Sequence, residues 1–141
     1  MDIKKIEHIG IAVRNLETAR TFYEGILGLR CYKTETVEDQ KVKTAFYRIG
    51  EVKIELLEST DPEGPVARFI EKRGEGIHHL AFKTGELTRT LSELDKKGVR
   101  LIDKRPRPGS DQMEIAFLHP SATSGVLIEL CKPAGADEDQ S

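Results

Sequence analysis

Two stretches, VKIELLE at residues 52–58 and VLIELCK at residues 126–132, decide the fold because each is nearly a copy of the other. A second matched pair precedes them, with IEHIGIAV at residues 6–13 and IHHLAFKT at residues 77–84. Matched segments that recur in the same order indicate an internal repeat. We infer that the chain contains two related modules.

An amphipathic helical stretch follows the first segment of each module. Apolar residues recur at helical spacing over residues 16–27 and again over residues 87–97. Gly28 and Gly98 stand just beyond these stretches, where a glycine typically ends a helix in the left-handed conformation. Further strand-like runs complete the modules: residues 29–35 and about 43–49 in the first, and residues 99–105 and about 113–118 in the second.

The predicted order of elements in each module is therefore β-α-β-β-β, which indicates an α+β fold. Two such modules, joined side by side, would form a curved, mixed and mostly antiparallel sheet around a concave cup. We expect one domain over residues 1–141. Its parts are module 1 (about 3–58), a linker (about 59–75) with a short helix around Val66–Lys72, module 2 (about 76–133) and a polar, acidic tail (134–141) that should fray.

The bulk composition describes a soluble globular protein. Its 141 residues are 38% hydrophobic and 33% charged, and the net charge of −2 does not suggest a nucleic-acid partner. No run approaches the roughly 18 apolar residues of a membrane span. Cys31 and Cys131 are too few for a disulfide framework, so we expect both to be reduced structural residues in a cytoplasmic protein.

Strand alternation predicts which side chains enter the cup. Successive side chains on a strand point to opposite faces, so the apolar positions of the four matched segments should pack beneath the helices. These positions are Ile9, Ile11, Val13, Ile54, Leu56, Leu80, Phe82, Val126, Ile128 and Leu130. The intervening positions then aim two imidazoles and two carboxylates into the cup: His8, Glu55, His79 and Glu129.

A shared divalent cation explains this grouping. Burying four such groups without compensation would cost several kcal/mol each, although a single histidine or glutamate in a strand is usually structural. Two nitrogen and two oxygen ligands suit Zn, Co, Ni, Mn or Fe(II), and four ligands leave an octahedral ion open to substrate. His78 alternates onto the helix face beside Leu80, so we expect it to pack or to support the ligands.

With these residues in place, the chain resembles the vicinal oxygen chelate superfamily, which includes glyoxalase I and the extradiol dioxygenases. The resemblance is closest to its methylmalonyl-CoA epimerase family. The segments that carry it are EHIGIAV at 7–13, FYEGILGL at 22–29, KIELLES at 53–59, GEGIHHLAF at 74–82 and FLHPSATSGVLIEL at 117–130.

The resemblance implies a metal-dependent isomerase that interconverts (2R)- and (2S)-methylmalonyl-CoA. In that chemistry the C2 proton leaves through a metal-stabilised enolate, and a base is needed on each face. Glu129 and Glu55 are the candidate bases as well as ligands. Some epimerases are thought to carry a glutamate base where this chain has Thr44, so either Glu55 or the loop residue Glu38 takes that role here. A homodimer is the family expectation.

Other functions of the same superfamily remain open. A glyoxalase I-type lyase, acting on a thiol hemithioacetal, uses the same ligand set, and a drug-binding resistance protein would need no catalytic metal. An acyl-CoA substrate would require cations for its phosphates. Lys104, Arg105 and Arg107 are the candidate substrate-binding residues, although an ordinary solvated loop explains them equally well.

Overall fold

The computed structural model describes residues 1–135. The chain forms two compact units, which are described separately: a first unit of residues 8–78, and a second unit that joins residues 1–7 to the chain from His79 onward. The opening strand therefore contributes residues to both units. Of the predicted fraying tail, residues 136–141 lie outside the described part of the chain.

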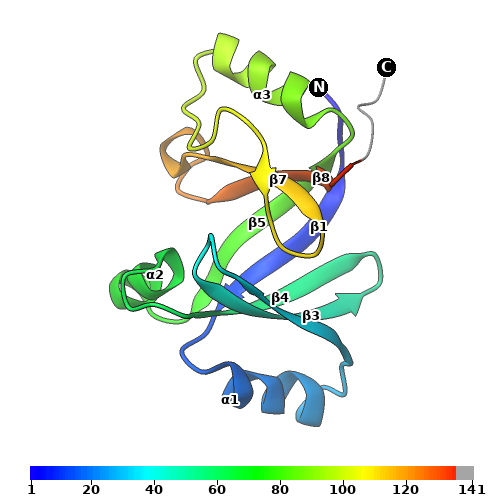
Figure 1. Ribbon diagram of the computed structural model, residues 1–141, viewed down its shortest axis with the longest axis vertical. Helices are drawn as coiled ribbons and strands as arrows, with labels where there is room; N and C mark the ends of the chain where they lie inside the picture. The colour runs from blue at the N-terminus through cyan, green and yellow to red at the C-terminus, as the bar shows by residue number, and fades with distance from the viewer. Residues whose placement is uncertain (136–141) are drawn as a thin grey trace. The chain divides into compact units, whose positions relative to one another are not determined.

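The first unit carries one β-α-β-β-β module. Its elements are β1 (Ile3–Ala12), α1 (Leu16–Arg20), η1 (Thr21–Ile26), β2 (Cys31–Val37), β3 (Val42–Ile49), β4 (Val52–Ser59) and α2 (Pro65–Arg73). The strand order is β2-β3-β4-β1, in which β1 runs parallel to β4 and the other pairs are antiparallel. Helix α1 lies against this sheet (Figure 1). The α2 helix confirms the short helix predicted in the linker.

The second unit repeats the same topology. Its elements are β5 (Gly76–Thr84), α3 (Leu87–Lys96), β6 (Arg107–Pro108), β7 (Met113–Leu118), η2 (Pro120–Ala122) and β8 (Ile128–Pro133). The order is β6-β7-β8-β5, and again only the first strand of the module, β5, pairs in parallel with the last. The predicted α+β class and the two β-α-β-β-β modules are confirmed.

Local sequence explains where the first helix begins and ends. The Asn15 side chain accepts the backbone N–H of Thr18 at 2.8 Å, and a Glu58 carboxylate accepts that of Leu16 at 2.6 Å. Carboxylates and amides satisfy the open N–H groups of a first turn. The helical stretch predicted over residues 16–27 is present, but its second half, η1, is π-helical. It ends before Gly28, whose φ of 72° is the expected left-handed conformation.

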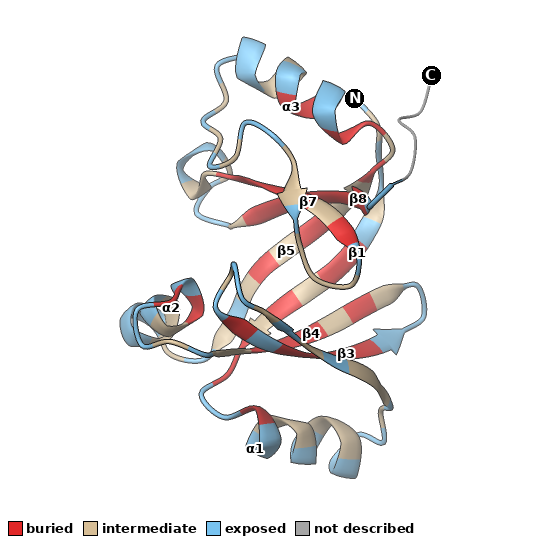
Figure 2. Ribbon diagram, viewed as in Figure 1, coloured by how far each residue is buried: buried red, intermediate tan, exposed pale blue. Residues whose placement is uncertain are grey.

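The cores lie where strand alternation placed them. In the first unit the core beneath α1 contains Val13, Leu16, Ala45, Tyr47 and Leu56, with Ile11 and Ile54 packed against it. In the second unit Leu80 and Phe82 pack against a core of Leu87, Leu91, Ala116, Leu118, Ile128 and Leu130. Figure 2 shows the same pattern, with buried residues on β7 and β8 and exposed residues on the outer surface of α3.

The strand predicted over residues 99–105 is wrong. Leu101 forms an isolated bridge to Leu118, and the short strand β6 comes later, at Arg107–Pro108. The Asp103 carboxylate accepts the Phe117 N–H at 2.9 Å, so a side chain takes the hydrogen bond that a neighbouring strand would otherwise provide. Pro106 and Pro108, just beyond this stretch, have no N–H to donate, and the pairing that follows at β6 is only two residues long.

Val126 does not pack beneath a helix as predicted. Its side chain is 45% exposed, and β8 begins two residues later at Ile128. Ser124 and Gly125 have φ values of 59° and 89°, so the chain is still turning at this point. Alternation holds only within an extended strand, which is why it fails before β8 starts.

No helix in the described residues is both long enough and apolar enough to cross a membrane. Cys31 and Cys131 are free cysteines in the structure, the first partly buried and the second buried.

The Glu24 carboxylate ties η1 to the first-unit sheet. It accepts the Tyr47 hydroxyl at 2.7 Å and the Arg20 Nε–H at 2.6 Å. The hydrogen bond from Arg20, and to a lesser degree the one from Tyr47, lowers the pKa of Glu24 below its ordinary 4.5. Burial raises the pKa of Tyr47. One carboxylate thus joins a helix residue to a core residue.

We expect Glu24→Gln to lower the free energy of unfolding by about 1 kcal/mol at pH 7, because charge-assisted hydrogen bonds weaken and the site is partly solvated. A carboxyl with a lowered folded pKa stabilises the protein above its unfolded pKa, and this contribution is lost as pH falls through the folded pKa. The difference from wild type should therefore shrink below pH 4.5. Urea denaturation at pH 7 and pH 3 measures it. Glu17→Gln is the control, because the Glu17 side chain is 74% exposed.

Candidate metal and active site

The first unit brings His8 and Glu55 together. Gly10 of β1 lies opposite Glu55 of β4, and His8 precedes Gly10 by two residues on the same face. The His8 Nδ1 atom is 3.2 Å from Glu55 Oε2, and both side chains are only 3% exposed. The sequence placed these two residues on one face, and the parallel pairing makes them neighbours.

The second unit builds the same pair from His79 and Glu129. Ala81 of β5 lies opposite Glu129 of β8, and His79 precedes Ala81 by two residues. The His79 Nε2 atom is 3.5 Å from Glu129 Oε1, and both side chains are buried. The Phe117 ring stands perpendicular to the His79 ring with centroids 5.8 Å apart, so the imidazole is held by an aromatic edge.

The spacing within each pair suits ligands of one cation. Two ligand atoms bound to the same ion at about 2.1 Å, in octahedral or tetrahedral geometry, lie about 3.0–3.4 Å apart. The pairs measure 3.2 and 3.5 Å. An imidazole nitrogen beside a carboxylate oxygen is also a donor set that borderline divalent ions accept. The residues present in each unit therefore fit half of a metal site.

His78 is a packing residue, as its alternation predicted. Its ring stands edge-on to the Phe69 ring of α2, with centroids 5.0 Å apart. Burial lowers the pKa of His78 from its ordinary 6.5 to about 4, because a charged imidazole would lose its hydration there. His78 therefore packs on α2 as a neutral, partly buried ring.

Lys53 was missed by the sequence analysis although the pattern contained it. It precedes Glu55 by two residues, so alternation already placed it on the same face. In the structure Lys53 lies opposite His8 in the parallel register and is 5% exposed. A buried ammonium beside the His8–Glu55 pair adds positive charge to this face and favours an anionic ligand there.

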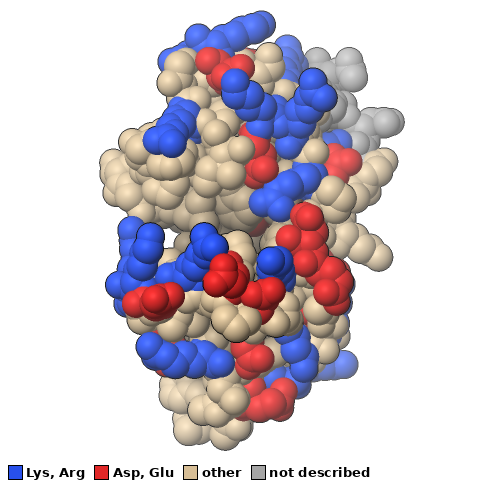
Figure 3. All heavy atoms as spheres, turned by 60° about the vertical axis from the view of Figure 1, so that its left-hand side comes forward, with Lys and Arg blue, Asp and Glu red and all other residues tan. Residues whose placement is uncertain are grey.

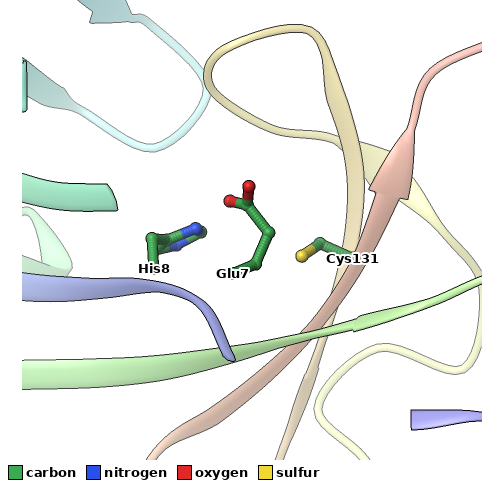
Figure 4. A group of neighbouring side chains, drawn as sticks. All are labelled: Glu7, His8 and Cys131. Atoms are coloured by element: carbon green, nitrogen blue, oxygen red, sulfur yellow. The ribbon is translucent and has the colours of Figure 1, made fainter. Parts of the chain in front are cut away.

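Glu7 was also missed. It is 5% exposed, and its carboxylate lies within 4.8 Å of the buried Cys131 thiol of β8 (Figure 4). Cys131 follows Glu129 by two residues and shares its face. Glutamate is usually exposed, so the burial of Glu7 would have been hard to predict from the surrounding residues.

Thr44 lies on the same sheet face as the first-unit pair. Phe46 of β3 is opposite Glu55, and Thr44, two residues away, is opposite Leu57. The side chain is fully buried, and its Oγ1 has no hydrogen-bond partner among the described residues. A buried hydroxyl without a partner costs free energy, so it marks a place where a bound group can be held.

The three cations of the basic loop separate in space. Arg107 Nε donates to Asp103 Oδ1 at 3.0 Å, and its guanidinium lies 5.6 Å from the centroid of the Phe117 ring, which contacts His79. Lys104 is 73% exposed and approaches Asp95 of α3, and Arg105 is exposed. Arg107 is therefore connected to the second-unit pair through Phe117. Figure 3 shows cations and anions interspersed across one face, without an extended basic surface.

The first unit also has a cleft of about 350 Å³ beside α2. It is lined by Val13, Arg14, Ser59, Thr60, Asp61, Pro62, Ala67 and Ile70. None of these residues is a predicted ligand, so the cleft lies apart from the His8–Glu55 pair.

The model of the glyoxalase/bleomycin resistance protein/dioxygenase superfamily matches residues 7–117. The chain belongs to this superfamily. The match covers most of both modules and includes three of the four predicted ligands; it ends before Glu129.

Relatives within the superfamily are similar over almost the whole chain. The ethylmalonyl-CoA/methylmalonyl-CoA epimerase of Cereibacter sphaeroides is 32% identical, over 91% of this chain and 97% of its own length. The uncharacterized protein YqjC of Bacillus subtilis is 46% identical, over 98% and 99%. Among solved structures, a variant of Streptomyces coelicolor methylmalonyl-CoA epimerase bound to 2-nitronate-propionyl-CoA is 35% identical, with a TM-score of 0.90 over 97% and 99%.

Proposed function

We propose that this protein is an isomerase that interconverts (2R)- and (2S)-methylmalonyl-CoA. The observation that carries the proposal is the likeness, over 97% of the chain, to an epimerase bound to an acyl-CoA analogue. The paired imidazoles and carboxylates support it, because they are the groups that proton exchange next to a thioester requires. The similarity to the ethylmalonyl-CoA/methylmalonyl-CoA epimerase of C. sphaeroides adds further support.

The four ligands are assigned to one divalent ion: His8 and Glu55 from the first unit, and His79 and Glu129 from the second. The spacing within each pair supports this assignment, and the donor set fits Zn, Co, Ni or Mn. When bound, such an ion supplies Lewis-acid stabilisation for negative charge that develops on the thioester oxygen.

The residues of the chain perform the proton transfers. Glu129 is the proposed base on one face of C2, because a buried carboxylate held near an imidazole can take and return a proton. Its pairing partner Phe117 is apolar and limits water beside it. Glu55 is a ligand and the sequence-based candidate for the second base.

Substrate anions would meet cations on both units. Lys53 is buried beside the His8–Glu55 pair and can neutralise the substrate carboxylate. Arg107, held by Asp103 over Phe117, is placed to bind an anionic group near the second-unit pair. Lys104 and Arg105 are exposed and are assigned to the coenzyme A phosphates.

Deuterium exchange tests the function directly. Metal-loaded protein is incubated with (2R)-methylmalonyl-CoA in deuterated water, and C2 deuterium and the (2S) epimer are followed by mass spectrometry and a coupled assay. We expect both to appear. EDTA treatment should remove the ion and the activity together, with the ion followed by metal analysis. A protein that forms neither product would contradict the proposal.

The glyoxalase I-type reaction is the second candidate, because the two-histidine, two-glutamate donor set serves it equally. Methylglyoxal with a thiol is the discriminating substrate, since its turnover without methylmalonyl-CoA turnover would favour a lyase. A protein that retains no metal would instead favour a drug-binding role. We also propose a cytoplasmic homodimer, which cell fractionation and light scattering can check.

A further inference from the structure

Arg107 stands on the same sheet face as the His79–Glu129 pair of the second unit. Phe117 of β7 lies opposite Glu129 of β8, so these two side chains share one face. Ile115, two residues before Phe117, lies on this face too, and Arg107 of β6 is directly opposite Ile115. The Arg107 guanidinium is 5.6 Å from the centroid of the Phe117 ring, whose neighbour is the His79 ring. Register and ring contact therefore place one cation near the pair.

The Asp103 carboxylate uses both of its oxygens to hold this arrangement. Its Oδ1 atom accepts the Arg107 Nε–H at 3.0 Å, and its Oδ2 atom accepts the Phe117 N–H at 2.9 Å. The Asp103 N–H donates in turn to the Phe117 carbonyl oxygen at 3.2 Å. The Asp103 side chain is only 16% exposed, so these hydrogen bonds are partly shielded from water. One carboxylate thus ties the guanidinium to the backbone of the residue over which it lies.

The chain on the other side of Arg107 is held against β7 as well. The Gly109 N–H donates to the Met113 carbonyl oxygen at 2.9 Å. A Cβ atom on Gly109 would lie 2.6 Å from Ile115 Cγ2, so a side chain here would force either the loop or Ile115 to move. A loop held at both Asp103 and Gly109 has little conformational freedom left to lose when a ligand binds. Arg107 is therefore a preorganised cation.

A guanidinium in this setting suits a carboxylate. Asp103 engages the Nε–H, and the Nη atoms carry further N–H donors in the planar arrangement that matches the two oxygens of a carboxylate. The Arg107 side chain is 33% exposed, so a ligand can reach it without opening the interior. Its place near Glu129, the proposed base, favours an anion at the reacting end of the substrate over a phosphate of the coenzyme A tail.

We propose that Arg107, positioned by Asp103, recognises the free carboxylate of the substrate and makes the site selective for a dicarboxylic acyl thioester. The inference rests on the proposed function, and it adds the residue that distinguishes methylmalonyl-CoA from an acyl-CoA without a free carboxylate. Arg107 binds the carboxylate through its N–H donors and transfers no proton. Asp103 is a positioning residue, which acts through the guanidinium.

Two ligands that differ only in this carboxylate test the proposal. Metal-loaded protein is titrated in a calorimeter with propionyl-CoA and with methylmalonyl-CoA, supplied as the equilibrated mixture of its epimers so that turnover releases no net heat. The ratio of the two dissociation constants is the carboxylate preference. We expect Arg107→Gln to lower this preference by about 10- to 100-fold, the usual effect of losing hydrogen bonds to a charged group, and to leave the affinity for propionyl-CoA within about twofold of wild type.

A double-mutant cycle separates positioning by Asp103 from support of the fold. In Asp103→Asn the amide oxygen can still accept the Phe117 N–H, but the amide nitrogen meets the Arg107 Nε–H, so two donors face each other. We expect the carboxylate preference to fall by about 5- to 20-fold in Asp103→Asn, and to fall no further when this substitution is added to Arg107→Gln. Metal content and urea denaturation are measured on the same samples.

Arg105→Gln is the matched control, because it removes the same charge from an exposed position of the same loop. It should change the affinities for propionyl-CoA and methylmalonyl-CoA by one common factor and leave the carboxylate preference unchanged. A lowered preference in this variant would show that the net charge of the loop, and not the held guanidinium, selects the carboxylate.

Three further outcomes would overturn the proposal. An equal loss of affinity for both ligands in Arg107→Gln would place Arg107 at the coenzyme A phosphates. A normal preference in Arg107→Gln, with a collapsed one in Lys53→Met, would place carboxylate recognition in the first unit. An additive effect of Asp103→Asn in the Arg107→Gln background would show that Asp103 acts through the fold. These affinities do not depend on turnover, so a wild-type protein that prefers methylmalonyl-CoA but inverts neither epimer would contradict the epimerase function alone.

Discussion

The His79→Ala variant is expected to lose its bound divalent ion and its turnover together, whereas His78→Ala keeps both and loses stability. His79 Nε2 lies 3.5 Å from Glu129 Oε1, in the spacing of two ligands on one ion. His78, the next residue, packs its ring against Phe69 of α2. Neighbouring residues on a strand point to opposite faces, so two adjacent imidazoles have different environments.

The expected size of each effect follows from these contacts. Removing a ligand removes charge stabilisation of the reacting oxygen, and we expect turnover by His79→Ala to fall by at least about a hundredfold. Truncating the partly buried ring of His78 should cost about 1–2 kcal/mol of unfolding free energy. Metal content by plasma mass spectrometry, turnover and urea denaturation measure the three quantities. Metal loss in His78→Ala with retention in His79→Ala would reverse the assignment.

The second large effect is expected from Glu129→Gln. The amide oxygen can still occupy a ligand position, but the amide cannot accept a proton, so the substitution separates the two roles of this residue. We expect the metal to remain largely bound and inversion to fall by about 10²- to 10⁴-fold. One epimer should still exchange its C2 proton without inverting, because the second base would still serve that face.

Comparing both epimers makes this result specific. Metal content and the deuterium uptake of each epimer are measured on the same protein sample. Glu114→Gln is a suitable control, because Glu114 is opposite Lys132 on the other face of the β7–β8 pair and is 38% exposed. Wild-type inversion by Glu129→Gln would show that this carboxylate only binds the metal.

The repeat in the sequence was sufficient to predict most of the architecture. Strand and helix positions from Val42 to Arg73 and at Met113–Leu118 agree with the structure to within about two residues. The prediction failed at residues 99–105, where Leu101 forms only an isolated bridge and the Asp103 side chain accepts the Phe117 N–H. It failed again at Val126, because alternation was applied to residues that are still in a turn.

The individual residues of the His–Glu pairs were predictable, because His8, Glu55, His79 and Glu129 occupy equivalent positions of a duplicated pattern with period two. Lys53 obeys the same rule and was overlooked. The burial of the Thr44 hydroxyl was not predictable, since nothing local in the sequence states what packs against this position of β3.

The sequence by itself determined the duplication, the two β-α-β-β-β modules and the face on which each candidate ligand lies, because side-chain alternation and helical spacing are local properties of the chain. Only the tertiary structure decided the distances within each His–Glu pair, the separation of Arg107 from Lys104, and the burial of the Thr44 hydroxyl. These depend on strand register and loop path, which are set by hydrogen bonds and packing between segments far apart in the sequence.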